Sequence, residues 1–317
     1  MSVVTNWLPQ TTNRAVRVFA WASLISQVLI IGTGGAVRLT GSGLGCPTWP
    51  RCTEDSFVST PEMGFHGIIE FGNRLLTFVL AIIAVVMVVL LIRLRRERPE
   101  LFRLAVVLGL GIPGQAVIGG ITVLTDLNPW IVGLHYVLSL VLVALAAVLL
   151  YRVRTGPRSE SWAVPAPFRV LSSALVGVLS ISLVMGVITT GSGPHSGDGG
   201  AARNGLDSWL LQHLHAWPSY VVFGLILTMT VVTWIAPVGA PALRRAITGA
   251  LIITVVQIGV GLYQARNGLP ELAVGVHMVL AAVLLAVVTT ALLAQRAVVT
   301  REAADQPLRK QTTGLGS

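Results

Sequence analysis

Eight long apolar segments alternate with short polar stretches along the chain. They cover residues 16–36, 67–92, 104–124, 130–151, 168–189, 209–235, 243–263 and 272–295. Each holds about 20 mostly apolar residues, the length of helix that crosses roughly 30 Å of hydrocarbon. Strands that span a membrane are shorter and alternate in polarity, so the pattern predicts helices. The predicted fold class is therefore all-α integral membrane, with eight transmembrane helices.

Composition agrees with this pattern. Hydrophobic residue types make up 54% of the 317 residues, charged types 11%, and the mean hydropathy is +0.78. A soluble domain contains about 25% charged residues. The composition therefore excludes a soluble two-domain protein.

The net charge of +9 reflects where the basic residues lie. They gather in the segments that share one side of the membrane if the N-terminus is inside, and the outer loops hold few. The positive-inside rule then predicts a multi-pass cell-membrane protein with both termini in the cytoplasm. Nucleic-acid binding is not expected. These inner basic residues are Arg14, Arg17, Arg93, Arg95, Arg96, Arg98, Arg103, Arg152, Arg154, Arg158, Arg169, Arg244, Arg245, Arg296, Arg301, Arg309 and Lys310.

An internal repeat relates the two halves of the chain. The segments IVGLHYVL and AVGVHMVL carry His135 and His277, which are equivalent under a shift of about 142 positions, and the same shift superimposes two Gln and two Gly residues. LTGSGLG after the first segment also resembles TTGSGPH after the fifth. Each half has an even number of spans, so the halves are predicted to be parallel four-helix-bundle repeats side by side.

This repeat predicts the organisation of the chain. We expect a cytoplasmic segment at 1–15, an N-terminal four-helix half at 16–151 with an outer loop at 39–66, and a cytoplasmic linker at 152–167. The C-terminal half follows at 168–297, and a disordered cytoplasmic tail at 298–317.

Histidines near the outer ends of the even-numbered segments are the first candidates for chemistry. His215 and His277 lie at matching depth in segments 6 and 8. Two neutral imidazoles on facing helices can supply both axial ligands of a haem iron. Zinc is disfavoured because it requires four ligands. His213 faces roughly the other way from His215, and we assign no role to His213, His66 or His195.

The first half does not repeat this pair. The position equivalent to His215 is Asn73, so only His135 remains. Glu70 lies one turn away on the same face as Asn73, and it either forms an ion pair with Arg74 or moves protons beside a bound cofactor. Arg74 is also a candidate cofactor-binding residue. Arg38 either holds haem propionates or extends to the membrane interface.

Two cysteines, Cys46 and Cys52, lie in the first outer loop, in GLGCPTWPRC. A disulfide can persist outside the membrane, and the spacing across a turn allows one. A metal pair lacks further Cys or His ligands nearby. We predict a disulfide, whose role is either structural or redox.

Together these motifs resemble one family. The TGSGLGC-x-x-WP-x-C run, IIEFGNR in segment 2 and the GLH and GVH motifs are similar to those of haem A synthase over about residues 16–297. The resemblance implies oxidation of the C8 methyl of haem O to a formyl group by successive hydroxylations, in support of cytochrome oxidase assembly. It also implies haem b on His215 and His277, and a substrate site at His135 and Glu70, with both haem sites near the outer face. Expected partners are haem O synthase, membrane lipid and, in a homo-oligomer, a second copy.

One position departs from the family pattern. The family reads Glu-x-x-His in segment 2, whereas this chain has Asn73 at the place of the histidine. The substrate haem is then either five-coordinate on His135 or approached on its other face by Glu70, His66 or water. Two other classes stay open: a di-haem electron carrier, which would want two bis-histidine sites, and a transporter built from parallel repeats.

Overall fold

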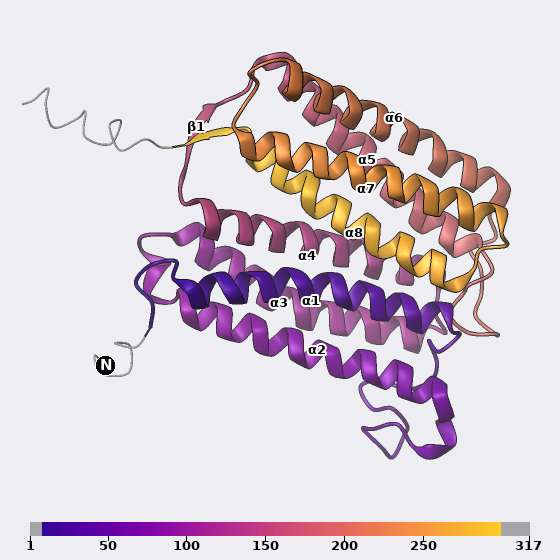
Figure 1. Ribbon diagram of the computed structural model, residues 1–317. Helices are drawn as coiled ribbons and strands as arrows, with labels where there is room; N and C mark the ends of the chain where they lie inside the picture. The colour runs from indigo at the N-terminus through magenta and orange to yellow at the C-terminus, as the bar shows by residue number, and fades with distance from the viewer. Residues whose placement is uncertain (1–7, 299–317) are drawn as a thin grey trace, which may run out of the picture.

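The computed structural model describes residues 8–298 (Figure 1). Within this range, eight helices are long and apolar enough to cross a membrane, so the chain is a multi-pass membrane protein. Short 3-10 helices, η1 (Pro61–Met63) and η2 (Arg93–Arg95), flank the second one. The long helices are α1 (Arg14–Leu39), α2 (Gly64–Leu91), α3 (Pro99–Leu124), α4 (Pro129–Thr155), α5 (Ala166–Ser192), α6 (Ser208–Ile235), α7 (Pro241–Arg266) and α8 (Glu271–Leu293).

The helix ends follow ordinary start signals. The Asn13 side chain accepts a hydrogen bond from the Val16 amide at 3.1 Å, and Asp207 accepts from the amides of Trp209 and Leu210. Helices α3, α4 and α7 begin with proline, which has no N–H group to leave unpaired there. Because these signals lie outside the apolar runs, the predicted spans differ from the helices by little more than a turn.

The helices pack in two groups (Figure 1). Buried residues of α1–α4 form one hydrophobic cluster, which includes Met87, Leu101 and Leu149. Buried residues of α5–α8 form another, which includes Leu175, Ile226 and Ile247.

A third cluster joins the two groups through α1, α4 and α8. It is rich in small residues, which include Ala147, Ala282 and Ala286 and let helix backbones approach closely. At the contact between α4 and α8, the Tyr136 hydroxyl donates to the carbonyl of Met278 at 3.3 Å. These two residues are equivalent under the sequence shift. The symmetry of the two halves itself stays a prediction.

Two short strands were not expected from the apolar pattern. Strand β1 (Arg158–Trp162) pairs antiparallel with β2 (Arg296–Val298), so the expected linker at 152–167 is partly ordered against the end of α8. The Arg296 guanidinium donates to the carbonyl of Glu160 and lies 3.6 Å from the ring centre of Trp162. Backbone pairing between segments so distant in sequence leaves no period in an apolar profile. Of the predicted tail, residues 299–317 lie outside the described residues.

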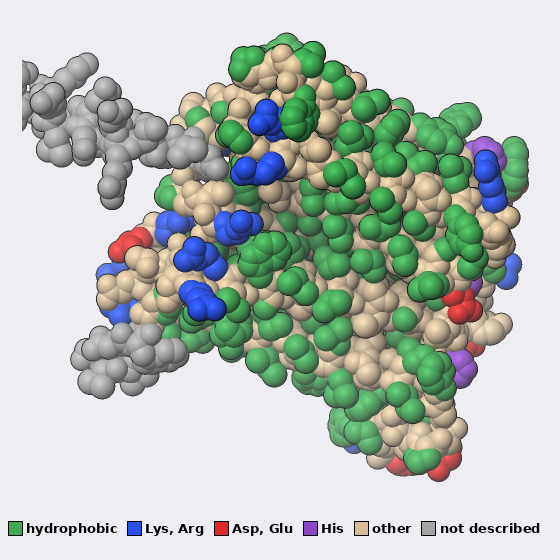
Figure 2. All heavy atoms as spheres, in the orientation of Figure 1, with side chains coloured by type: hydrophobic (Ala, Val, Ile, Leu, Met, Phe, Trp, Pro, Cys, Tyr) green, Lys and Arg blue, Asp and Glu red, His purple; other side chains and the backbone are tan. Residues whose placement is uncertain are grey.

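Charge is distributed unevenly over the surface. Figure 2 shows most of the visible arginine side chains at one end of the molecule and a broad hydrophobic surface in the middle. The other end carries histidine and acidic side chains together with a few basic ones. The ends of α2, α4, α6 and α8 and the starts of the odd-numbered helices share the arginine-rich end. The positive-inside rule predicts that this end is cytoplasmic.

Candidate functional site

His215 of α6 and His277 of α8 face each other near the outer end of the C-terminal half. Their ring centroids are 6.2 Å apart and their planes are inclined by 78°. Two imidazoles that bind one metal from opposite sides have centroids about 6 Å apart, because each metal–nitrogen bond is about 2 Å long. The predicted pair is therefore brought together at a separation that suits a shared metal.

The environment of His215 fixes which ring nitrogen is free. Its Nδ1 lies 2.9 Å from the carbonyl oxygen of Ser182 on α5. A carbonyl only accepts, so Nδ1 carries the hydrogen and Nε2 keeps its lone pair. The backbone carbonyl of His215 accepts from the Ser219 hydroxyl at 2.8 Å. A second group that orients a histidine in this way is typical of metal ligands.

His277 and His135 have matching surroundings. Gln257 donates to the carbonyl of His277 at 3.0 Å, and Gln115 donates to the carbonyl of His135 at 3.2 Å. Among the described residues, the buried Nδ1 atoms of both histidines and the buried Oε1 atoms of both glutamines have no hydrogen-bond partner. Buried polar atoms are seldom left unpaired without a functional reason.

Glycines make room for the same rings. A Cβ added at Gly261 would lie 3.3 Å from Cε1 of His277, and one at Gly119 would lie 3.3 Å from Cε1 of His135. A Cβ added at Gly186 would lie 3.0 Å from Cε1 of His215. The repeat therefore preserves the packing of the His135 and His277 rings as well as the histidines themselves.

The residues present fit a haem better than a metal bound by protein alone. No group of three or more His, Cys, Asp or Glu residues between residues 8 and 298 could hold a metal ion. Two opposed histidines leave the remaining coordination positions to a macrocycle, which is the arrangement of a bis-histidine haem. The facing rings and the free Nε2 of His215 are the two features that fit a haem.

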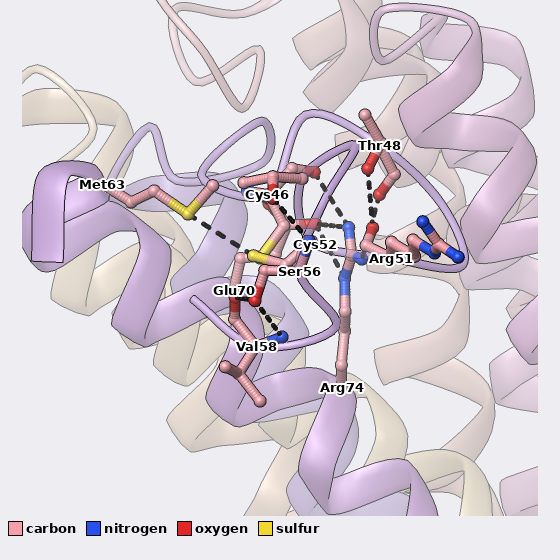
Figure 3. Close-up of a disulfide and its surroundings, with 10 residues drawn as sticks. Cys46, Thr48, Arg51, Cys52, Ser56, Val58, Met63, Glu70 and Arg74 are labelled. Carbon is pink, nitrogen blue, oxygen red and sulfur yellow. Dashed lines mark hydrogen bonds and ion pairs between the residues drawn. A yellow bond between two sulfur atoms is a disulfide. The ribbon is translucent and has the colours of Figure 1, made fainter. Parts of the chain in front are cut away.

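A second cluster surrounds Glu70 at the outer end of α2 (Figure 3). Cys46 and Cys52 form the predicted disulfide, and both are fully buried. The Glu70 carboxylate, only 5% exposed, accepts from the Cys46 amide at 2.6 Å and from Nη2 of Arg74 at 2.5 Å. The Glu70–Arg74 ion pair, one of the two alternatives for Glu70, is therefore present, and it lies directly beneath the disulfide loop.

Arg74 also binds the loop backbone. It donates to the carbonyls of Cys46, Thr48 and Arg51 at 2.9 to 3.0 Å, in addition to Glu70 (Figure 3). These contacts engage all five N–H groups of the guanidinium. The geometry gives Arg74 an anchoring role and leaves it no donor for a cofactor carboxylate, contrary to our expectation of cofactor binding.

Glycines also allow this loop to pack closely against the helices beneath it. Gly45 packs against the backbone of His66 on α2 so closely that a Cβ there would overlap with it. Trp49 lies over Gly120 of α3, where a Cβ would overlap with the indole. In the C-terminal half the position equivalent to Gly120 is Leu262, whose side chain is exposed. The disulfide loop is therefore specific to the N-terminal half.

The packing of Trp49 against Gly120 can be tested by substitution. Gly120→Leu, which copies Leu262, should expel the indole and speed reduction of the Cys46–Cys52 disulfide by an external phosphine about tenfold or more, since overpacking costs about 1–3 kcal/mol. Gly114→Ala on the same helix is the control, because its added Cβ meets no atom within 4 Å. Equal reduction rates in the two variants would show that Trp49 does not hold the loop.

Arg38 connects the two outer loops. Its Nε donates to the His195 carbonyl at 2.7 Å, and its Nη2 donates to the Thr190 carbonyl at 3.0 Å. The amide of Gly43 donates to the carbonyl of Gly197 at 2.8 Å. Burial lowers the pKa of the His195 imidazole; the negative charge of Glu271 opposes this shift, and the positive charge of Arg38 adds to it. Arg38 keeps N–H groups that are not used in these contacts, so binding of a carboxylate stays open.

His66 borders an outer cavity of about 580 Å³. Met63, Pro47 and Asp198 also line it. Nδ1 of His66 lies 2.9 Å from the hydroxyl of Ser42, which is fully buried. The cavity therefore opens between the disulfide loop and the loop after α5, one helical turn outward from Glu70.

Some predicted residues are not joined. Among residues 8–298, no hydrogen bond or ion pair connects His135 with Glu70 or Asn73. Asn73 instead accepts from the Thr33 hydroxyl at 2.7 Å. His213 stacks on Trp209, with ring centroids 4.3 Å apart, and is exposed. His135 and Glu70 thus lie in the same half without a hydrogen bond between them.

Sequence reasoning missed the supporting residues. The internal repeat aligns Gln115 with Gln257 and Gly119 with Gly261. Each of these residues lies on the helix that precedes its histidine, and this placement could have identified them as supporting residues. Ser182, Gly186 and Trp49 carried no such signal, because the first two support a histidine that has no counterpart and the third lies in an insertion.

The sequence of this chain is similar to those of known proteins. Residues 17–289 match the model of a family described as cytochrome oxidase assembly protein. The chain is 31% identical over 144 residues to the haem A synthase of Geobacillus thermodenitrificans, which is 45% of this chain and 44% of that protein. It is 36% identical over 141 residues to the haem A synthase of Lysinibacillus sphaericus, 44% of each chain.

These pairwise matches span less than half the length of the relatives, whereas the family model covers most of this chain. The model match includes every helix that carries a candidate histidine. The chain therefore belongs to the COX15-CtaA family of cytochrome oxidase assembly proteins.

Proposed function

We propose that this protein is a haem A synthase, an intramembrane oxidoreductase. It converts the C8 methyl of haem O to a formyl group through successive hydroxylations, and the product serves cytochrome oxidase assembly. The observation that carries the proposal is the His215–His277 pair at 6.2 Å in a chain of this family. Haem O synthase is the expected supplier of substrate.

In this proposal the C-terminal half holds haem b as a resident cofactor. His215 and His277 would be its axial ligands, and the haem would supply one-electron transfer. Ser182 holds the His215 ring with Nε2 free, and Gln257 fixes the backbone at His277. Gly186 and Gly261 let both rings stay at this depth.

The N-terminal half would bind the substrate haem. His135 is its proposed axial ligand, and it has the same Gln and Gly supports as His277. Asn73 is engaged by Thr33 and is a weak ligand for iron, so we propose a substrate iron held by His135 alone on the protein side. Arg38, at the outer end of α1, would bind a propionate through its unused N–H groups.

Glu70 is the proposed proton-handling residue of this half. Each hydroxylation replaces a C–H bond by a C–O bond and requires protons to be moved at the site, and a buried carboxylate can accept or donate them. Arg74 and the Cys46 amide hold the two carboxylate oxygens in place. The same contacts tie the position of Glu70 to the disulfide loop, so loop and carboxylate act as one unit.

The experiment that tests the function is haem extraction from a haem O-producing host that expresses the chain. Chromatography should show a new peak of haem A or of the hydroxylated intermediate. Cells that carry the empty vector are the control. Bound haem b with untouched haem O would contradict the proposal and favour a membrane electron carrier.

A further inference from the structure

A cavity of about 400 Å³ lies at the arginine-rich end, between α6 and α7. It is far from the histidine pair, which lies near the opposite ends of its helices. Its lining residues are Trp234, Pro241, Arg244, Arg245, Thr248, Gly249 and Ile252.

The mouth of this cavity carries positive charge without a partner in the protein. Arg244 and Arg245 are exposed in the first turns of α7, and neither forms an ion pair with a described residue. No Asp or Glu occurs between residues 208 and 270. The start of α7 adds the positive end of a helix dipole. The charge at this mouth therefore suits an anion.

Below the mouth the cavity becomes apolar. The Trp234 indole, 61% exposed, lies 4.7 Å from the Arg244 guanidinium and donates to the Thr248 hydroxyl at 3.1 Å. Ile252, which also lines the cavity, lies about 10 Å further along α7 than Arg245. The cavity thus presents two arginines at the membrane interface and a hydrophobic wall in the hydrocarbon region.

We propose that this cavity binds one anionic phospholipid of the inner leaflet. Its phosphate would be held by Arg244 and Arg245, and the start of one acyl chain would lie along Trp234 and Ile252. Basic pockets on the cytoplasmic side of transmembrane helices favour anionic headgroups. The apolar wall distinguishes this site from a surface that binds a free phosphate or an acidic protein.

The test measures lipid binding to the full-length purified protein by native mass spectrometry, with phosphatidylglycerol and phosphatidylcholine of identical chains. The wild type should retain phosphatidylglycerol selectively. Arg244→Gln/Arg245→Gln should weaken its retention about tenfold or more. Arg95→Gln/Arg96→Gln is the matched control, because it removes two adjacent exposed arginines from the same end.

A second readout locates the bound lipid. Phosphatidylglycerol with brominated chains should quench Trp234, measured as the difference between the wild type and Trp234→Phe. Equal weakening by both double variants would reduce the effect to general surface charge and overturn the proposal. Equal retention of the two lipids by the wild type, or displacement of the lipid by millimolar inorganic phosphate, would also overturn it.

Discussion

Replacing His277 with alanine should abolish the low-spin haem b spectrum of the purified protein. His277 and His215 face each other at a separation suited to one iron. Loss of one ring leaves an open axial position, so the remaining haem should become high-spin and its content should fall more than about tenfold. Reduced-minus-oxidised difference spectra and pyridine haem quantification measure both effects.

His213→Ala is the matched control for this prediction. His213 lies on the same helix as His215 but packs against Trp209 and is exposed. Its removal should leave the spectrum unchanged. A normal low-spin spectrum in His277→Ala would show that the C-terminal assignment is wrong, whatever happens in His213→Ala.

Glu70→Gln should retain haem b and lower haem A formation at least about 100-fold, which is the typical contribution of a general acid or base. The amide keeps an oxygen to accept from the Cys46 amide, so the loop contact survives while the proton acceptor is lost. Conversion of haem O in membranes, followed by chromatography, measures activity. The haem b spectrum of the same sample reports an intact C-terminal half.

Arg74→Gln separates chemistry from structure. It removes the anchors to the carbonyls of Cys46, Thr48 and Arg51 but leaves the Glu70 carboxylate. If Glu70 acts in proton transfer, Glu70→Gln should be inactive while its disulfide stays protected from reduction. Arg74→Gln should be more active than Glu70→Gln, although its disulfide should be easier to reduce. If both variants lose activity only in proportion to disulfide exposure, Glu70 is a structural partner of Arg74.

The asymmetry between the halves follows from one insertion and one substitution. The first outer loop carries the disulfide and Trp49, and these cover the outer end of the N-terminal half. Asn73 replaces the histidine that the C-terminal half has at His215. In the proposed enzyme, one half is a closed cofactor site and the other is a covered reaction site with one protein ligand.

Several features were determined by the sequence alone. Continuous apolar runs define the spans because backbone groups in hydrocarbon must pair within one helix, so each span is a local property. The repeat identified His135 and His277 as equivalent, and the spacing of Cys46 and Cys52 in an outer loop predicted their disulfide. Family membership also followed from short motifs.

Other features were decided only by the tertiary structure. Arg74 was a candidate cofactor ligand, but the loop carbonyls and Glu70 together occupy all its donors, and carbonyl positions leave no trace in a sequence. The free Nε2 of His215 depends on Ser182, a residue of another helix. The pairing of β1 with β2 depends on contacts between opposite ends of the C-terminal half. Periodicity reports which face of a helix is apolar, whereas the partner of each polar group is set by how the helices pack.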